Sequence, residues 1–267
     1  MAPEAEFFKP GNDISWLVRQ FEAIHYDSSN PLTDKFVPRA DTSLVFHFGN
    51  LPRIIKPANQ PLPPFFMAPL CPTANSIMIE GETEVFIATC KPTVLSRVLR
   101  ISMIPGKLIY IPVSEPVFRP LWEKMKKQHN LSGRIEVFSR FIHKLHPGEY
   151  IPDETDLMYD KILNNSTSTA LHRIIRGFSV SERTVQRRLS DRLGITPKKL
   201  ERIIKINYLW NRINANVNLD YQDLVYMGNY YDQTHLIKDF KAITGETPDH
   251  FFRRNLKVAK ILSGREL

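Results

Sequence analysis

The chain has 267 residues, of which 42% are hydrophobic and 24% charged, a composition typical of a globular protein and not of a disordered chain. Its net charge is +8 and its isoelectric point about 9.4, values that agree with a polyanionic partner. The sequence has neither a run of about eighteen apolar residues nor a signal-peptide pattern, so we expect no membrane span and a cytoplasmic location.

The N-terminal part begins with patterns of mixed character. Residues 12–26 allow either a short helix or the start of a strand. Ser43–Phe48 places Leu44, Phe46 and Phe48 on one face, with Val45 and His47 on the other, and therefore predicts a strand. His47 in that strand could face a ligand, although histidines on strand faces are more often packed or solvated.

Proline content shapes the next segment. Residues 52–72 contain seven prolines, which lack the N–H donor that a central strand needs, so this segment is predicted to be loop or sheet edge. Two apolar runs follow, Ser76–Ile79 and Thr83–Thr89. They flank the turn sequence Glu80-Gly81-Glu82 and are predicted to form a hairpin.

Further short runs extend the predicted sheet. Leu99–Met103 alternates as a strand would, Pro105-Gly106 breaks that strand, and Leu108–Ile111 is another apolar run. The two cysteines, Cys71 and Cys90, have no metal-ligand spacing and are expected to be free thiols in a reducing compartment. Several short strands with turns between them predict an antiparallel sandwich or barrel.

From Leu121 onward the pattern becomes helical. Arg134–Leu145 carries an apolar stripe at helical spacing, which predicts a helix facing the core beneath the sheet. The expected linker is Gly148–Asp153, and Asp156–Asn165 should be the first helix beyond it. The predicted fold is therefore multidomain α+β, with a β-rich domain in residues 1–149 and an all-α domain in residues 150–267.

A repeat organises the C-terminal domain. The stretch Ser181–Leu200 recurs 51 residues later as Asp232–Phe251. Each copy begins with a good N-cap residue, carries apolar residues at spacing four, and ends at a glycine that is followed by a Thr-Pro helix start. Each copy also follows a short amphipathic run and a turn. This is the layout of a helix-turn-helix unit, whose second helix can lie in a DNA major groove.

The first copy has the stronger chemistry for reading bases. With Val185 and Leu189 turned inward, Arg183, Gln186 and Arg187 fall on the outer face near the helix start. Arginine suits guanine and glutamine suits adenine, whereas Arg188 and Arg192 on the flank suit phosphate. A solvated basic helix face is the alternative, but the turn, the caps and the repeat favour a DNA-binding role.

The second copy is less basic. Its outward candidates for base or backbone contact are Thr234, Ile237 and Lys238, with Lys241 for phosphate. His235 is outward as well, but no other His or Cys lies at ligand spacing, so we do not expect a metal there.

The second copy also carries the motif Tyr230–Leu236, then Phe240-Lys241 and Gly245–Pro248. On these residues the last hundred or so resemble the DNA-binding domain of the AraC/XylS family of bacterial transcriptional regulators. The resemblance implies two helix-turn-helix motifs joined by a long helix, here about 197–215, which engage two successive major grooves. The DNA-binding residues expected from this match and from the flanking positions are Arg183, Thr184, Gln186, Arg187, Arg188, Gln233, Thr234, Ile237, Lys238 and Lys241.

Four positions depart from the family pattern. The small residue usual in the first helix of each unit is Ile175 or Val225 here, and the turn glycine is Ser179 or Asn229. Asparagine tolerates positive φ better than most residues, so Asn229 is the milder change. These departures affect the expected docking geometry and not the expected fold.

The N-terminal part resembles, over about a hundred residues, the cupin-like domain of some AraC-type regulators. The resemblance implies a sensor domain for a small molecule or partner, and it implies that the helix 134–145 either faces the core or pairs with its copy in a dimer. Its histidines, His25 and His47, are too few and wrongly spaced for a cupin metal site, so we expect no metal and no cofactor.

Three functions follow, in order of preference. The first is a sequence-specific DNA-binding transcriptional regulator that is not an enzyme and is modulated at its N-terminal domain. The second is a small-molecule-binding cupin-like enzyme with a helical assembly domain. The third is an interaction module whose helix-turn-helix units do not bind DNA. For the first, double-stranded DNA and an unknown small-molecule effector are the expected partners, and RNA polymerase and a second copy of the chain are further candidates.

Overall fold

The computed structural model describes residues 3–56, 59–101, 103, 110–213 and 220–265. The strands in these residues are β1 (Glu4–Phe8), β2 (Val18–Tyr26), β3 (Leu32–Phe36), β4 (Thr42–Gly49), β5 (Arg53–Lys56), β6 (Gln60–Pro61), β7 (Phe65–Ala68), β8 (Asn75–Ile79) and β9 (Thr83–Cys90). The helices are α1 (Pro92–Val98), α2 (Glu115–Lys126), α3 (Leu131–Leu145), α4 (Glu154–Asn165), α5 (Leu171–Arg176), α6 (Glu182–Leu193), α7 (Pro197–Arg212), α8 (Tyr221–Met227), α9 (Gln233–Thr244), α10 (Pro248–Arg253) and α11 (Lys257–Leu262).

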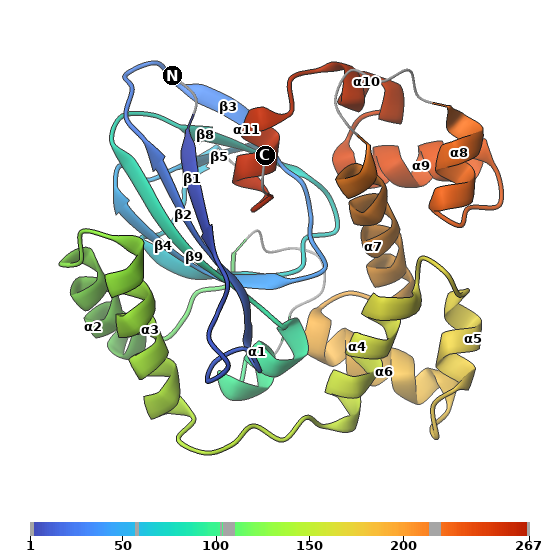
Figure 1. Cartoon of the computed structure of the whole chain (residues 1–267), viewed down its shortest axis with the longest axis horizontal. Helices are drawn as coiled ribbons and strands as arrows, with labels where there is room; N and C mark the ends of the chain where they lie inside the picture. The colour runs from blue at the N-terminus through green and yellow to red at the C-terminus, as the bar shows by residue number, and fades with distance from the viewer. Residues whose placement is uncertain (1–2, 57–58, 102, 104–109, 214–219, 266–267) are drawn as a thin grey trace.

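The β part of the chain, β1–β9 with α1–α3, contains two antiparallel sheets (Figure 1). The larger sheet has the order β1-β2-β9-β4-β7, and the smaller has the order β3-β8-β5-β6. Apolar side chains from both sheets, including Ile24, Val45, Ile54 and Phe66, form one buried cluster between them. The observed layers confirm the predicted β-rich N-terminal fold.

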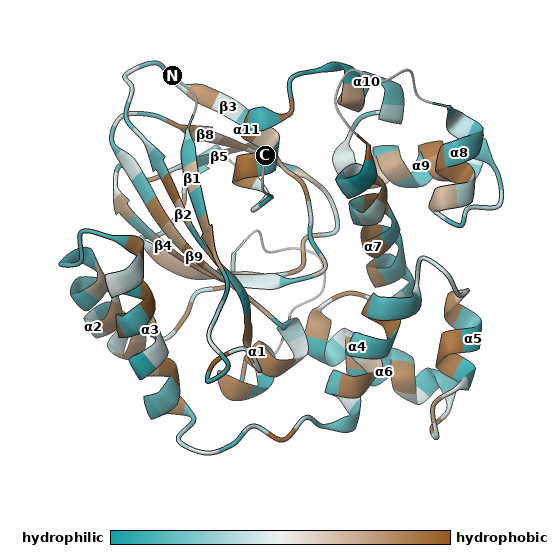
Figure 2. Ribbon diagram, viewed as in Figure 1, coloured by the Kyte–Doolittle hydropathy of each residue, from teal (hydrophilic) through white to brown (hydrophobic). Residues whose placement is uncertain are grey.

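The outer face of the larger sheet is covered by helices. Phe138 of α3 is fully buried and meets the rings of Phe21, Phe46 and Phe86 at centroid distances of 5.8 to 6.2 Å. The apolar stripe of α3 therefore faces the core, which is one of the two arrangements expected for this helix. Figure 2 shows the same arrangement, with hydrophobic residues along the strands that α2 and α3 flank.

The N-terminal strand patterns have mixed outcomes. The strand at Ser43–Phe48 is confirmed as β4, and the ambiguous residues 12–26 contain β2. The predicted hairpin is wrong, because β8 pairs with β3 and β5 whereas β9 pairs with β2 and β4. Both β8 and β9 have a hydrogen-bonded neighbour on each side, and they lie in different sheets. The turn at Gly81, with φ of +67°, therefore carries the chain from one sheet to the other.

The strand predicted at Leu99–Met103 is also wrong where the structure describes it. Helix α1 runs from Pro92 to Val98, and proline is a favoured residue at the first position of a helix. Arg100 then has a φ of +52°, which is outside the strand region. The predicted break at Pro105-Gly106 lies outside the described residues. Of the last apolar run, Ile111 forms a single bridge with Met67.

The helical part, α4–α10, is assembled around α7. Ile203, Ile206 and Leu209 of α7 are buried in a cluster that takes in residues from both helix-turn-helix units. Val37, Ala40 and Leu70 of the β part belong to the same cluster, so the two parts share an apolar interface. No helix within the described residues is long and apolar enough to cross a membrane.

The last helix leaves the helical part. Helix α11 returns to the β part and packs against β3, near which the C-terminus lies (Figure 1). Ile261 is completely buried in the cluster between the two sheets. The C-terminal end of the chain therefore completes the core of the N-terminal part, which its sequence position does not indicate.

Candidate nucleic-acid interface

The first helix-turn-helix unit is α5, a turn and α6. The Ser181 hydroxyl caps α6 by accepting a hydrogen bond from the Thr184 N–H at 3.3 Å. Val185, Leu189 and Leu193 are fully buried and fix the inner face of the helix. Gly194, with φ of +71°, ends the helix in the left-handed conformation that glycine adopts without steric cost.

The outer face of α6 presents three of the predicted residues to solvent. Arg183, Gln186 and Arg187 are exposed, and neither arginine forms an ion pair within the described part of the chain. Gln186 donates to Glu182 at 3.2 Å, a surface contact that exchanges readily with another partner. These side chains are therefore available to base edges near the start of the helix.

The flanking residues of α6 are differently engaged. Arg188 is half-buried and ion-paired with Glu154 of α4, while Thr184 shares a hydrogen bond with Ser181. Arg192 donates to the Thr93 carbonyl of α1 at 3.0 Å and to Asp153 at 2.9 Å. Because these bonds hold Arg192 in the interface between the β and helical parts, we no longer assign it to phosphate.

The second unit is α8, a turn and α9. The Asp232 carboxylate caps α9 by accepting from the His235 N–H at 2.7 Å, while Leu236 and Phe240 are buried. The predicted DNA-binding residues of α9 lie on its opposite side: Gln233, Thr234, Lys238 and Lys241 are exposed and Ile237 is half-buried.

The departures from the family pattern have structural explanations. Asn229 has a φ of +50°, so an asparagine occupies the turn position that needs this conformation. Ser179 is not among the described residues with positive φ, and its hydroxyl donates to Glu154 at 3.3 Å. Ile175 is 3% exposed and Val225 packs against the same core, so both bulky residues are accommodated.

Other exposed residues next to the recognition helices were not among the predicted DNA-binding residues. Arg173 and Arg176 lie on the exposed side of α5, the helix that crosses the DNA backbone in a helix-turn-helix unit. Tyr226 and Tyr231 flank the second turn and are 88% and 92% exposed. The place of Tyr231 in the motif of the second copy is a sequence signal that could have identified this surface, whereas the exposure of both side chains comes from the structure.

The second unit is also fastened to the β part. Lys35 of β3 forms an ion pair with Glu246 and donates to the Thr244 carbonyl at 3.0 Å. Asp34 of the same strand pairs with Arg254 at 2.6 Å. Each helix-turn-helix unit is thus anchored at a different place on the N-terminal part, the first on α1 and the second on β3.

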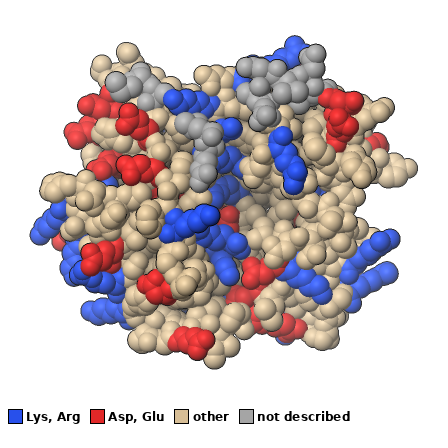
Figure 3. Space-filling view, in the orientation of Figure 1, with Lys and Arg blue, Asp and Glu red and all other residues tan. Residues whose placement is uncertain are grey.

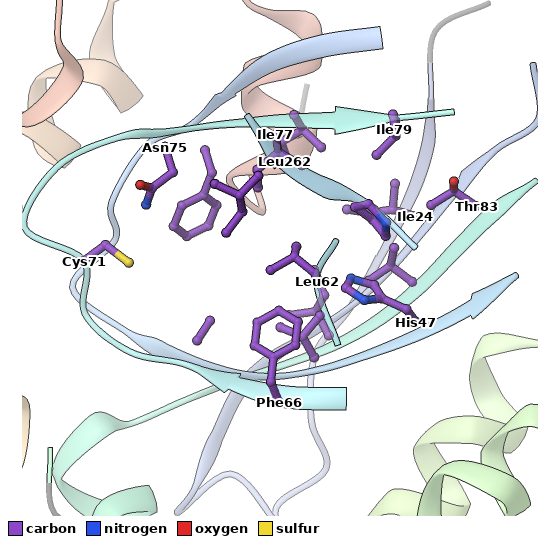
Figure 4. A pocket seen from close by; sticks show the side chains of 17 residues that line it. Ile24, His47, Leu62, Phe66, Cys71, Asn75, Ile77, Ile79, Thr83 and Leu262 are labelled. Atoms are coloured by element: carbon purple, nitrogen blue, oxygen red, sulfur yellow. The ribbon is translucent and has the colours of Figure 1, made fainter. Parts of the chain in front are cut away.

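A small apolar cavity lies between the two sheets (Figure 4). It has a volume of about 90 Å³ and is lined mainly by aliphatic and aromatic side chains from both sheets, with Leu262 of α11 at one side. His47 lines it and is buried, with its Nδ1 atom 2.8 Å from the Pro63 carbonyl oxygen. Burial lowers the pKa of His47 to about 4, so the ring is neutral at pH 7.

Within the described residues, no group of three or more His, Cys, Asp or Glu side chains is arranged to hold a metal ion. Cys71 and Cys90 are both buried free thiols, as their spacing predicts. Burial raises the pKa of the Cys71 thiol to about 11, which disfavours the reactive thiolate.

Part of the C-terminal half matches a known family model. A family model described as a helix-turn-helix domain matches residues 174–254, which run from within α5 to the end of α10. No curated protein sequence matches the chain.

Among solved structures, ToxT from Vibrio cholerae is similar over 94% of this chain and 98% of its own, with 11% identity and a TM-score of 0.46. Wild-type ToxT from Vibrio cholerae bound to an unsaturated fatty acid is similar over 100% of this chain and 98% of its own, with 12% identity and a TM-score of 0.45. The xylose-binding transcription activator XylR covers 45% of this chain and 38% of its own, with 14% identity and a TM-score of 0.31. These likenesses are distant.

Proposed function

We propose, from the premise that the C-terminal part of this chain is an AraC-type helix-turn-helix domain, that the protein is a sequence-specific DNA-binding transcriptional regulator. The observation that carries this is the pair of capped helices, α6 and α9, whose inner faces are buried and whose outer faces present polar and basic side chains. Such helices fit a DNA major groove.

The residues divide by expected role. Arg183, Gln186 and Arg187 of α6 read base edges, because arginine and glutamine offer the bidentate donors and acceptors that purines match. In α9, Thr234, Ile237 and Lys238 make weaker base or backbone contacts. Gln233 and Lys241, together with Thr184 and Arg188 of α6, bind phosphate and set the register of the protein on the duplex. Binding by Arg188 requires release of its ion pair with Glu154.

We infer that the chain divides near residues 149 and 150 into a sensing and a DNA-binding part, with α11 returning to complete the core of the sensing part. Helix α7 joins the two units, and each unit is held by separate bonds to the β part. A molecule bound at the β part could therefore change how the two recognition helices are presented. In this way the N-terminal part regulates DNA binding without catalysing a reaction, and we propose no enzymatic activity.

RNA polymerase and a second copy of the chain are further proposed partners. For the dimer, the supporting observation is that the outer side of α2 and α3 leaves apolar residues in solvent, Val117 at 40% and Leu145 at 38% exposure. Light scattering on the purified protein distinguishes a monomer from a dimer.

The proposed function is tested by selecting duplexes from a random pool with the purified chain at low salt. We expect one enriched motif, protected across two consecutive major grooves in a footprint. Retention of all duplexes without sequence preference, or failure to retain duplex DNA at low salt, would contradict the proposal.

A further inference from the structure

A second, larger cavity lies between the β part and α7, and we call it the interdomain cavity. Its volume is about 530 Å³, within the range of about 300–1,000 Å³ usual for small-molecule sites, whereas the cavity between the sheets is well below that range. Its walls come from the β part, from α4 and α7, and from α11 with the residues that follow it. Figure 3 shows Lys and Arg side chains gathered in the hollow between the two parts.

The C-terminal tail builds one wall of this cavity. After α11, the Ser263 hydroxyl accepts from the Val37 N–H at 2.9 Å, and the Gly264 carbonyl accepts from Arg39 at 2.8 Å. Gly264 has a φ of +64°, and a Cβ atom there would collide with Arg39 and Glu22. The tail is therefore held closely against the β part at a position where only glycine fits.

Beyond Gly264 the chain reaches across to α7. The Arg265 guanidinium donates to the side-chain oxygens of Asn207 and Asn211, and it lies 4.1 Å from the centroid of the Trp210 ring. Arg265 thus connects the tail, which is fastened to the β part, with the helix that joins the two helix-turn-helix units.

The cavity has an excess of positive charge. Arg39, Lys260 and Arg265 line it, together with Asp41. Asp41 pairs with Arg19 at 2.8 Å, while Arg39 pairs with Glu22 at 2.9 Å. Neither Lys260 nor Arg265 meets a carboxylate within ion-pair distance in the residues that the structure describes.

Two buried donors in the walls also lack acceptors. The Nε atom of Arg265 and the Nε1 atom of Trp210 are inaccessible to solvent and make no hydrogen bond to the described residues. Unpaired buried donors are rare because each forfeits its hydration without compensation. Burial and the nearby Arg39 lower the pKa of Arg265 to about 9, and a bound anion would oppose that shift.

We propose that the interdomain cavity binds a small organic oxyanion, a metabolite-sized molecule with a carboxylate or phosphate group. Lys260 and Arg265 bind the anionic group, because an ammonium and a guanidinium form charge-assisted hydrogen bonds with either oxyanion. Tyr208, which is half-buried, offers aromatic surface to the rest of the molecule. This site deepens the proposed function, since its occupant would join the β part, the tail and α7 and so act as the effector.

The test is calorimetric titration of the purified full-length chain, without DNA, with inorganic phosphate and with succinate against chloride at matched ionic strength. We expect at least one of the two oxyanions to bind and to raise the melting temperature. Lys260→Gln and Arg265→Gln should each weaken that binding at least about tenfold. Lys257→Gln removes the same charge from an exposed position on the same helix and should leave it unchanged.

The proposal is overturned if neither oxyanion binds more strongly than chloride, or if Lys257→Gln weakens binding as much as Lys260→Gln. Lys260→Gln decides the outcome if Arg265→Gln does not fold, as circular dichroism will show. Gel shifts of the wild-type chain separate this test from the proposed function. If the wild-type chain binds DNA but no oxyanion, only the proposed oxyanion site is contradicted. If it binds an oxyanion but no DNA, only the proposed DNA recognition is contradicted.

Discussion

Arg187 is the residue at which base reading can be tested most directly, because its side chain is exposed and unpaired with any described carboxylate. We expect Arg187→Ala to cost about 1–3 kcal/mol on the selected duplex and much less on a scrambled one, since a lost bidentate contact affects only the matching base. Gel-shift titrations on both duplexes measure this. Arg140→Ala, at an exposed position of α3, is the control. Equal losses on the two duplexes would refute the base-reading role of Arg187.

His47 offers a test of burial through pH. Its pKa is about 4 in the folded chain and about 6.5 when unfolded, so between these values the unfolded state binds more protons. Stability should therefore fall as pH decreases from about 6.5 to 4, by at most about 3 kcal/mol from this residue. Urea unfolding at several pH values measures the decline, which His47→Gln should make shallower. An unchanged pH profile in the variant would show that other groups cause it.

At the scale of elements, the docking of α6 on α1 distinguishes this chain from a pair of domains joined only by a linker. Arg192 of α6 binds the Thr93 carbonyl and the Ser96 hydroxyl of α1, both at 3.0 Å, and also Asp153. Arg192, which the sequence analysis assigned to phosphate, therefore holds the first helix-turn-helix unit against the β part.

We expect Arg192→Ala to loosen this docking, because the carbonyl of Thr93 and the carboxylate of Asp153 lose their donor. Hydrogen exchange should become faster in α1 and α6 and stay unchanged in α9, whose anchors on β3 are separate. Arg253→Ala, an exposed substitution on α10, provides the comparison. Faster exchange confined to α6 would indicate that the helix itself, and not the docking, was weakened.

For the whole molecule, the basic excess of the C-terminal part predicts that salt weakens its binding to DNA. The excess of basic over acidic residues is +3 in residues 1–150 and +5 in residues 151–267. The logarithm of the association constant for any duplex should fall linearly with the logarithm of salt concentration, with a slope near −0.9 per phosphate neutralised. Lys241→Ala should weaken binding to all duplexes similarly and reduce the slope by about one. If the slope is unchanged, Lys241 does not contact phosphate.

The sequence by itself determined the two helix-turn-helix units. Their signals are local: the caps Ser181 and Asp232, the glycines that end α6 and α9, and the Thr-Pro helix starts that follow. The hydrogen bonds that these caps and helix ends form join residues only three or four positions apart. The neighbouring residues therefore suffice to predict where the helices begin and end. Strand β4 and the core-facing stripe of α3 were likewise predictable, because periodicity reports which side of an element is buried.

Only the tertiary structure decided which elements meet. It separated β8 from β9, placed Arg192 against α1, and returned α11 to β3 so that Ile261 enters the core of the β part. These outcomes depend on contacts between residues far apart in the sequence, and the competing pairings have similar local preferences. The interdomain cavity arises in the same way, since its walls come from segments far apart in the sequence that no local pattern connects.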